Sequence, residues 1–289
     1  MNPLEAVLSG SYAAGWAAVR TMPEGMARRL FRAGADAALL KGGFEQLTAN
    51  LARVAPGQDL RRAAVRSYAR YWCEVFRLPA MSRDRIVSGT TTTDEQLLRD
   101  SVASDRGTIL VLPHTGNWDA AGAWCGLTGV PFTTVAERLK PESLFEQFLA
   151  FRQSLGMEVL PLTGGPGPFD TLRKRLEAGG TICLLADRDL TPRGVDVQFF
   201  GSTARMPAGP AKLALETGAN LMPTTLSFTD DGWHIAFQPC IAHSDLTTMT
   251  QEVADAFARG IARHPADWHM LQRLWLEDLP DDDPRKQPQ

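Results

Sequence analysis

Four short apolar runs alternate with helix-like segments between residues 107 and 187, and this alternation constrains the fold more than any other feature of the chain. The apolar runs are 107–114, 132–137, 158–162 and 181–187. The helix-like segments between them are 119–125, 141–156 and 169–179. Such runs are typical of strands covered on both faces, and their alternation with helices predicts a parallel sheet. We therefore expect an α/β fold with a mostly parallel central sheet flanked by helices.

The N-terminal part looks helical and basic. Small and apolar residues recur at helical spacing over residues 3–80, with amphipathic stretches at 12–22 and 26–39. Residues 1–86 hold thirteen Lys and Arg against seven Asp and Glu. A basic, apolar helical cap of this kind suits an anionic membrane surface, with a solvated helical face as the alternative. No apolar run approaches the roughly 18–20 residues that span a bilayer, so we expect any membrane contact to be peripheral.

The C-terminal part predicts a hairpin and a last helix. Residues 220–240 have the pattern of two antiparallel strands that turn at Asp231–Gly232, and a helix is expected over 247–263. Because no internal repeat is visible, the chain predicts one domain over 1–280. The polar segment 281–289 is expected to be a disordered tail.

Charge and cysteine content narrow the class of protein. A net charge of -3 argues against a dedicated nucleic-acid binder. The four cysteines (Cys73, Cys125, Cys183 and Cys240) are far apart, which predicts reduced, buried thiols and no metal site. The first residues contain Glu5 and no early basic residue, which argues against a secretory signal. We expect a cytoplasmic protein.

Polar residues stand at the ends of the four expected strands. These residues are His114, Glu137, the segment Leu162–Gly165 and Asp187. In open α/β sheets, ligands bind beyond the carboxyl ends of the strands. The pattern therefore predicts a site at this edge, and three of the four positions offer a titratable group.

His114 and Asp119 are five residues apart within "LPHTGNWDAAG". On one continuous helix they would point about 140° apart and could not face each other. If His114 instead ends the strand, Thr115 or Asn117 can cap a helix that starts near Trp118. Asp119 then lies in the first helical turn, where the helix dipole favours a carboxylate, and can point back toward the histidine.

This stretch resembles the H-x4-D motif of the glycerolipid and lipid A acyltransferase superfamily. H-x4-D alone is a weak pattern, but the similarity continues in order over most of the chain. The segments that carry it are "YARYWCEVFRLPAM" (68–81), "VAERLKPESL" (135–144), "QSLGMEVLPLTGG" (153–165), "CLLADRDLT" (183–191), "FFGSTARMPAGPAKLALETGA" (199–219) and "HPADWHMLQ" (264–272). Within the superfamily, the chain is most similar to the branch that acylates phosphatidylinositol mannosides.

The resemblance implies a reaction and its place in the cell. It implies transfer of a long acyl chain, palmitoyl by expectation, from acyl-CoA to a mannose 6-hydroxyl of a phosphatidylinositol mannoside. Acyl-CoA would be a co-substrate, and no other cofactor is expected. The enzyme would be a peripheral protein on the cytoplasmic face of the plasma membrane, and we expect a monomer.

The resemblance also implies roles for site residues. His114 would be the general base, and the base needs an acid that orients it and stabilises the imidazolium. Asp187 matches the acid of the similar branch, where this position is a glutamate, and Asp119 would have that role in the wider superfamily. Glu137 and Arg152 match acceptor-binding positions, with Arg152 a candidate partner of Asp119. A structural ion-pair network is the alternative for these two.

A second candidate site is the segment 204–214, which contains Pro207 near an expected helix start. Arg205 and Lys212 flank that start, and a helix N-terminus between two cations can receive a phosphate of the donor or acceptor. Tight helix packing explains the small residues of this segment equally well.

Other functions fit the sequence less well than an acyltransferase. A serine hydrolase is disfavoured because the chain has no G-x-S-x-G elbow, and a phosphate-binding P-loop is also absent. The remaining alternatives are an acyltransferase for another glycolipid, such as a lipid A precursor, and a non-catalytic lipid-binding protein. The presence of His114, Asp119 and Asp187 together argues against the last of these.

Overall fold

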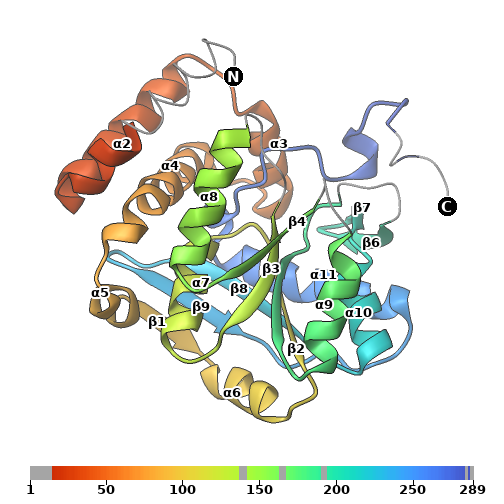
Figure 1. The fold of residues 1–289 in the computed structure, drawn as a ribbon. Coiled ribbons are helices and arrows are strands. Elements are labelled where there is room, and N and C mark those ends of the chain that lie inside the picture. Colours follow the sequence, from red (N-terminus) through yellow and green to blue (C-terminus); the bar gives the residue numbers. More distant parts are fainter. Residues whose placement is uncertain (1–14, 137–141, 163–166, 190–193, 284–285, 287–289) are drawn as a thin grey trace.

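A seven-stranded sheet forms the centre of the molecule in the computed structural model, which describes residues 15–136, 142–162, 167–189, 194–283 and 286 (Figure 1). The strand order is β1-β9-β8-β2-β5-β3-β4. These strands are β1 (Thr90–Thr93), β2 (Thr108–Leu112), β3 (Phe132–Ala136), β4 (Glu158–Pro161), β5 (Thr181–Leu185), β8 (Asn220–Phe228) and β9 (Trp233–Phe237). All neighbours pair in parallel except β8 and β9, which are antiparallel. The expected α/β class with a mostly parallel sheet is confirmed.

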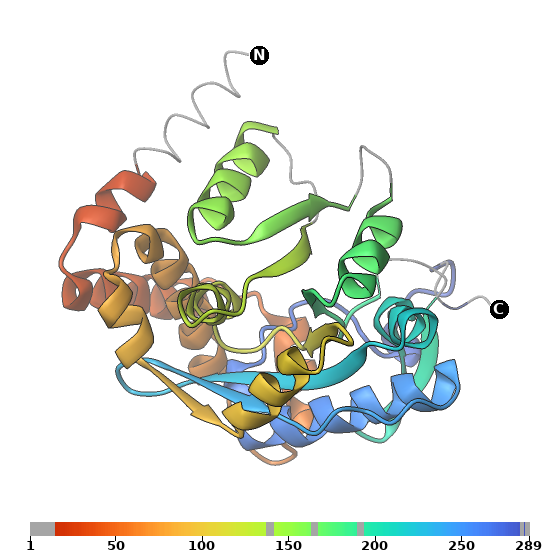
Figure 2. The ribbon, with the colours of Figure 1, turned by 60° about the horizontal axis from the view of Figure 1, so that its bottom comes forward.

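Helices cover both faces of the sheet. They are α2 (Glu24–Leu40), α3 (Glu45–Val54), α4 (Arg61–Arg77), α5 (Arg83–Ser88), α6 (Glu95–Ala103), α7 (Trp118–Leu127), α8 (Glu142–Ser154), α9 (Pro168–Glu177), α10 (Gly209–Thr217) and α11 (Leu246–Arg263). Short 3-10 helices lie between α4 and α5 (Leu78–Ala80) and after α11 (Pro265–Asp267 and Leu276–Asp278). Figure 2 shows α11 beneath the sheet, on the side opposite α7.

Strand β2 shows why both faces need helices. Its five residues are all buried, and their side chains alternate between two cores. Leu110 and Leu112 pack in the cluster that contains α4, α5, α6 and α7. Ile109 and Val111 pack in the cluster that contains α9, α10 and α11. A central strand with no polar face can be stable only between two apolar layers.

The N-terminal helices form a smaller unit at the edge of the sheet. Residues 15–21 are helical, and α2, α3 and α4 share an apolar cluster of their own (Ala35, Leu47, Leu51, Ala64 and Val65). In Figure 1, α2 is the outermost of these helices. Between residues 15 and 88 the structure has helices and turns only, in agreement with the expected helical cap.

Several elements differ from the sequence-based expectations. The edge strand β1 and the two-stranded sheet of β6 (Val195–Phe199) and β7 (Ser202–Met206) were not anticipated. The four strands expected between residues 107 and 187 (β2, β3, β4 and β5) end one or two residues earlier than expected. Cys73 and Cys125 are buried, Cys183 is half-buried and Cys240 is exposed, so the expectation of four buried thiols was wrong for Cys240 and only partly right for Cys183. Part of the expected tail, 284–285 and 287–289, lies outside the described residues.

Candidate active site

The side chains of His114 and Asp187 meet because their strands are neighbours in register. Strands β2 and β5 pair in parallel, with Leu112 opposite Leu185 as the last pair. His114 and Asp187 each follow two residues later, at the same level beyond the sheet edge. His114 Nδ1 lies 2.5 Å from Asp187 Oδ1. The site predicted at this edge thus has a histidine and a carboxylate in direct contact.

The Asp187 carboxylate is fully buried and receives three hydrogen bonds. Besides the His114 ring, the backbone N–H of His114 and the indole Nε1–H of Trp268 donate to Oδ2, each at 2.9 Å. Burial alone would raise the pKa of Asp187, but the His114 imidazole and these donors outweigh burial, so the pKa lies below its usual value. An ionised Asp187 makes Nδ1 the protonated ring nitrogen of His114. Nε2 then keeps its lone pair, and 22% of the side chain is exposed.

The turn after His114 is built for close packing. Gly116 has a φ of 54°, and a Cβ at this position would lie 3.0 Å from the backbone of Leu226. Asn117 then caps α7, because its side chain accepts a hydrogen bond from the backbone N–H of Ala120 at 3.0 Å. The expected helix start near Trp118 is confirmed, with Asn117 rather than Thr115 as the cap.

Asp119 lies in the first turn of α7 but has partners other than His114. Its carboxylate is buried and accepts hydrogen bonds from Arg152 Nε at 2.7 Å and from the Tyr71 hydroxyl at 3.0 Å. Burial by itself lowers the pKa of Arg152, but the charge of Asp119 more than compensates and raises it above its ordinary value. The expected pairing of Arg152 with Asp119 is present. The structure therefore brings Asp187, not Asp119, to the imidazole.

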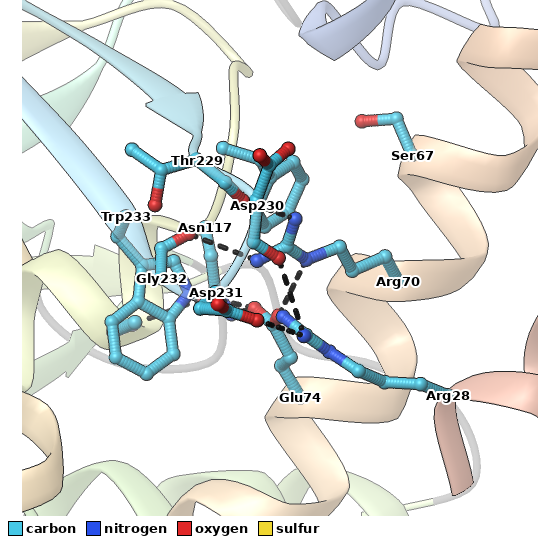
Figure 3. A network of polar contacts seen from close by, with 12 residues as sticks. Arg28, Ser67, Arg70, Glu74, Asn117, Thr229, Asp230, Asp231, Gly232 and Trp233 are labelled. Atoms are coloured by element: carbon cyan, nitrogen blue, oxygen red, sulfur yellow. Dashed lines mark hydrogen bonds and ion pairs between the residues drawn. The ribbon is translucent and has the colours of Figure 1, made fainter. Parts of the chain in front are cut away.

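Glu74 of α4 holds the turn between His114 and α7 through Asn117. Its buried carboxylate accepts hydrogen bonds from Asn117 at 3.0 Å, Trp233 at 2.6 Å, Arg70 at 2.7 Å and Arg28 at 3.3 Å (Figure 3). Arg28 comes from α2 and Asn117 is the cap of α7. This carboxylate therefore connects the N-terminal helices to the turn that carries His114.

The segment after α11 is a part of the site that sequence reasoning missed. Trp268 and His269 are buried, and the imidazole of His269 lies 3.0 Å from the Ser67 hydroxyl. Burial, and then the neighbouring His114, lower the pKa of His269 to about 3, so this imidazole is neutral at physiological pH. "HPADWHMLQ" contributed to the family resemblance, but nothing in its spacing indicated contact with His114.

The remaining predicted site residues are placed elsewhere or not described. Glu137 lies outside the described residues. Arg205 is buried and bound to Asp196 across the β6–β7 hairpin at 2.6 Å. Lys212 lies 3.8 Å from Glu216 and over the ring of Phe169. Protein carboxylates thus engage both cations, and their role in binding phosphate stays a prediction.

Two cavities border α7. A small apolar cavity of about 20 Å³ lies between α7 and the sheet, lined in part by Trp118, whose ring stands edge-on to His114 at 5.5 Å. A larger, open cavity of about 960 Å³ lies between residues 15–21, α5, α7 and α8, with Arg20 and Arg83 in its lining. The larger cavity is lined by the C-terminal half of α7, whereas His114 precedes the N-terminus of that helix.

The described residues offer neither a metal site nor a membrane-spanning helix. They contain no group of three or more His, Cys, Asp or Glu side chains arranged to hold a metal ion. Among the described helices, none combines the length and the apolar character needed to cross a membrane.

Comparison with known proteins places this geometry in a family. The family model for bacterial lipid A biosynthesis acyltransferases matches residues 4–277. The chain is 54% identical over 280 residues to a phosphatidylinositol mannoside acyltransferase of Mycolicibacterium smegmatis, covering 94% of this chain and 92% of that protein. It is 50% identical over 285 residues to the protein of that name from Mycobacterium tuberculosis H37Rv, covering 93% and 89%. The chain therefore belongs to the bacterial lipid A biosynthesis acyltransferase family.

Proposed function

We propose that this protein transfers a long acyl chain, such as palmitoyl, from acyl-CoA to a mannose 6-hydroxyl of a phosphatidylinositol mannoside. The contact between His114 and Asp187 at the sheet edge carries the proposal, because it supplies a base with an orienting acid. The acceptor is inferred from the two mycobacterial relatives, which are at least 50% identical over nearly the whole chain.

The chemistry needs one proton to move twice. His114 Nε2 removes the proton of the acceptor hydroxyl while that oxygen attacks the thioester carbonyl. The new C–O bond forms, the C–S bond breaks, and the imidazolium returns the proton to the departing thiolate of CoA. Asp187 stays ionised throughout and stabilises the imidazolium, as its lowered pKa requires.

The acceptor sugar is assigned to the side of the site formed by α7 and α8. Arg152 keeps about 20% of its side chain exposed while it is bound to Asp119, so its remaining N–H groups can donate to sugar hydroxyls. Glu137 follows β3 in the chain and completes this proposed acceptor site.

Peripheral binding to the cytoplasmic face of the plasma membrane is assigned to α2. Three of its large apolar side chains are exposed: Met26 by 58%, Leu30 by 54% and Leu40 by 90%. Arg29 and Arg32 are exposed on the same helix. Apolar side chains that enter the interface beside cations that meet anionic headgroups are the features of a monotopic helix.

Purified protein tests the reaction when it is incubated with palmitoyl-CoA and a panel of acceptors. The panel contains a phosphatidylinositol mannoside, a lipid A precursor and phosphatidylinositol, and one reaction is run without any acceptor. We expect free CoA to appear only with the mannoside and the acylated product to carry the chain on O6 of mannose. A His114→Ala variant with an unchanged circular dichroism spectrum serves as the control and should be inactive.

Three results would contradict the proposal in different ways. CoA release with the lipid A precursor alone would assign another glycolipid acceptor. Binding of the mannoside without turnover would support a lipid-binding protein. Near-normal turnover in the folded His114→Ala variant would remove the assigned base.

A further inference from the structure

The segment that contains Trp268 runs beside the turn that carries His114. Thr115 and Trp268 form an antiparallel bridge. On one side of it the backbone N–H of Gly116 donates to the carbonyl of Asp267 at 2.9 Å. On the other side the backbone N–H of His269 donates to the carbonyl of His114 at 2.8 Å. The position of Trp268 relative to His114 is therefore fixed by the main chain.

From this position the indole of Trp268 contacts Asp187, the acid that is paired with His114. Trp268 is fully buried, and its Nε1–H donates to Asp187 Oδ2 at 2.9 Å. The backbone N–H of His114 donates to the same oxygen. The oxygen that faces away from the imidazole thus has two fixed donors, and a carboxylate held at one oxygen cannot rotate about its Cβ–Cγ bond.

We propose that Trp268 is a positioning residue, whose indole N–H holds the Asp187 carboxylate in the plane in which Oδ1 meets His114 Nδ1. The inference deepens the proposed acyl transfer, and it assigns a role to a residue that never touches substrate. Hydrogen bonds from outside a reacting pair commonly set both the orientation and the basicity of its members.

The indole also sets the proton affinity of the pair. A donor to Asp187 favours the form with an ionised carboxylate and a neutral imidazole, which carries one net negative charge. Without that donor the negative charge is less stabilised, so the pair binds its next proton at a higher pH. Ionisable groups on the neighbouring elements are His269, Asp267, Arg188, Asp189, Asp119, Arg152 and Tyr71. All of them are retained when only the indole is changed.

The experiment replaces the indole and follows the imidazole directly. Trp268→Phe removes the N–H, and replacement of Trp268 by benzothienylalanine removes it with almost no change of shape. The matched control is Trp275→Phe, since Trp275 is equally buried but donates to the backbone carbonyl of Phe199 at 2.7 Å. The His114 imidazole is titrated by NMR in histidine-labelled protein without substrate, with its resonance identified by its loss in His114→Ala.

We expect the His114 titration midpoint to rise by about one pH unit in both Trp268 variants. The acid limb of kcat/KM for CoA release should rise with it, and kcat at pH 8 should fall about 10-fold, as for loss of a bond to a charged group. Trp275→Phe should leave the midpoint unchanged.

An unchanged His114 midpoint in the folded benzothienylalanine protein would overturn the proposal, even if activity fell, because packing alone would explain the loss. An equal rise in Trp275→Phe would overturn it too. If the wild-type protein transfers no acyl chain to any acceptor, the proposed function fails, while the NMR titration still decides the role of Trp268.

Discussion

Asp119 forms an ion pair with Arg152 at 2.7 Å, although it stands only five residues from His114 in the chain. The acid that contacts His114 is Asp187, which is 73 residues away. The two carboxylates of the site therefore have different partners, and their substitution should have different consequences.

Asp187→Asn should lower the single-turnover rate of acyl transfer far more than Asp119→Asn. The amide keeps the shape of the side chain but loses the charge that stabilises imidazolium, and in serine proteases this change costs about 10⁴ in kcat. Asp187→Glu should be milder, since it keeps the charge that stabilises the imidazolium. Rates are measured in variants with wild-type circular dichroism. A severe Asp119→Asn beside a nearly silent Asp187→Asn would reverse the assignment.

Replacing Met26 and Leu30 of α2 by serine should weaken binding to anionic vesicles by at least about 10-fold. Burial of one such side chain contributes roughly 1.5–3 kcal/mol, and both are more than half exposed. Leu215→Ser is the control, because this exposed leucine lies on α10. Co-sedimentation measures binding, and salt should weaken it through screening over about 8–10 Å. Equal binding of the wild-type protein to neutral and anionic vesicles would show that electrostatic attraction does not contribute to membrane binding.

Glu74→Gln should lower the free energy of unfolding by about 3 kcal/mol. The amide would place an N–H group among four donors and remove the charge that Arg28 and Arg70 face in a buried site. Urea unfolding measures the change, with Glu95→Gln as the control. Glu95 pairs with Arg99 at the surface of α6, and its loss should cost less than about 1 kcal/mol. Equal effects of the two variants would show that the Glu74 network contributes no special stability.

His269 should make the folded state less stable as the pH falls. Its folded pKa is about 3, whereas the ordinary value is 6.5, so the unfolded chain binds the extra proton between these values. The free energy of unfolding therefore decreases as the pH is lowered through this window, and His269 contributes up to about 1.4 kcal/mol of that decrease per pH unit. His269→Gln should remove that contribution. Urea unfolding at pH 7, 6 and 5 measures it, and identical pH slopes for the two proteins would contradict the prediction.

The strands between residues 107 and 187 could be predicted because they consist largely of apolar residues, as buried strands do. Runs such as residues 108–112 have no polar face, so only a position between two layers suits them. The edge strand β1 consists of four threonines that alternate between half-buried and exposed. Because only one of its faces is covered, its sequence contains no continuous apolar run that would reveal it. Strand β6 of the hairpin likewise has exposed residues in alternation with covered ones.

The site could be predicted to the level of its strands but not of its contacts. His114 and Asp187 were placed at strand ends, and register then brings them together. The choice between Asp187 and Asp119 remained open in the sequence, because it depends on Arg152 and Tyr71, which other helices bring to Asp119. Trp268 could not be found because 81 residues separate it from Asp187 and only the tertiary fold joins them.

The antiparallel bridge between Thr115 and Trp268 has a consequence for the order in which the protein is made. Every strand of the central sheet precedes residue 238, so a nascent chain can complete the sheet before residues 267–269 leave the ribosome. At that stage Asp187 lacks its indole donor and the main chain of His114 lacks the partner that His269 supplies. Residues 238–266, which include α11, therefore separate the last strand of the sheet from the segment that completes the site, and a chain that has been made only as far as residue 266 holds His114 and Asp187 without either of these partners.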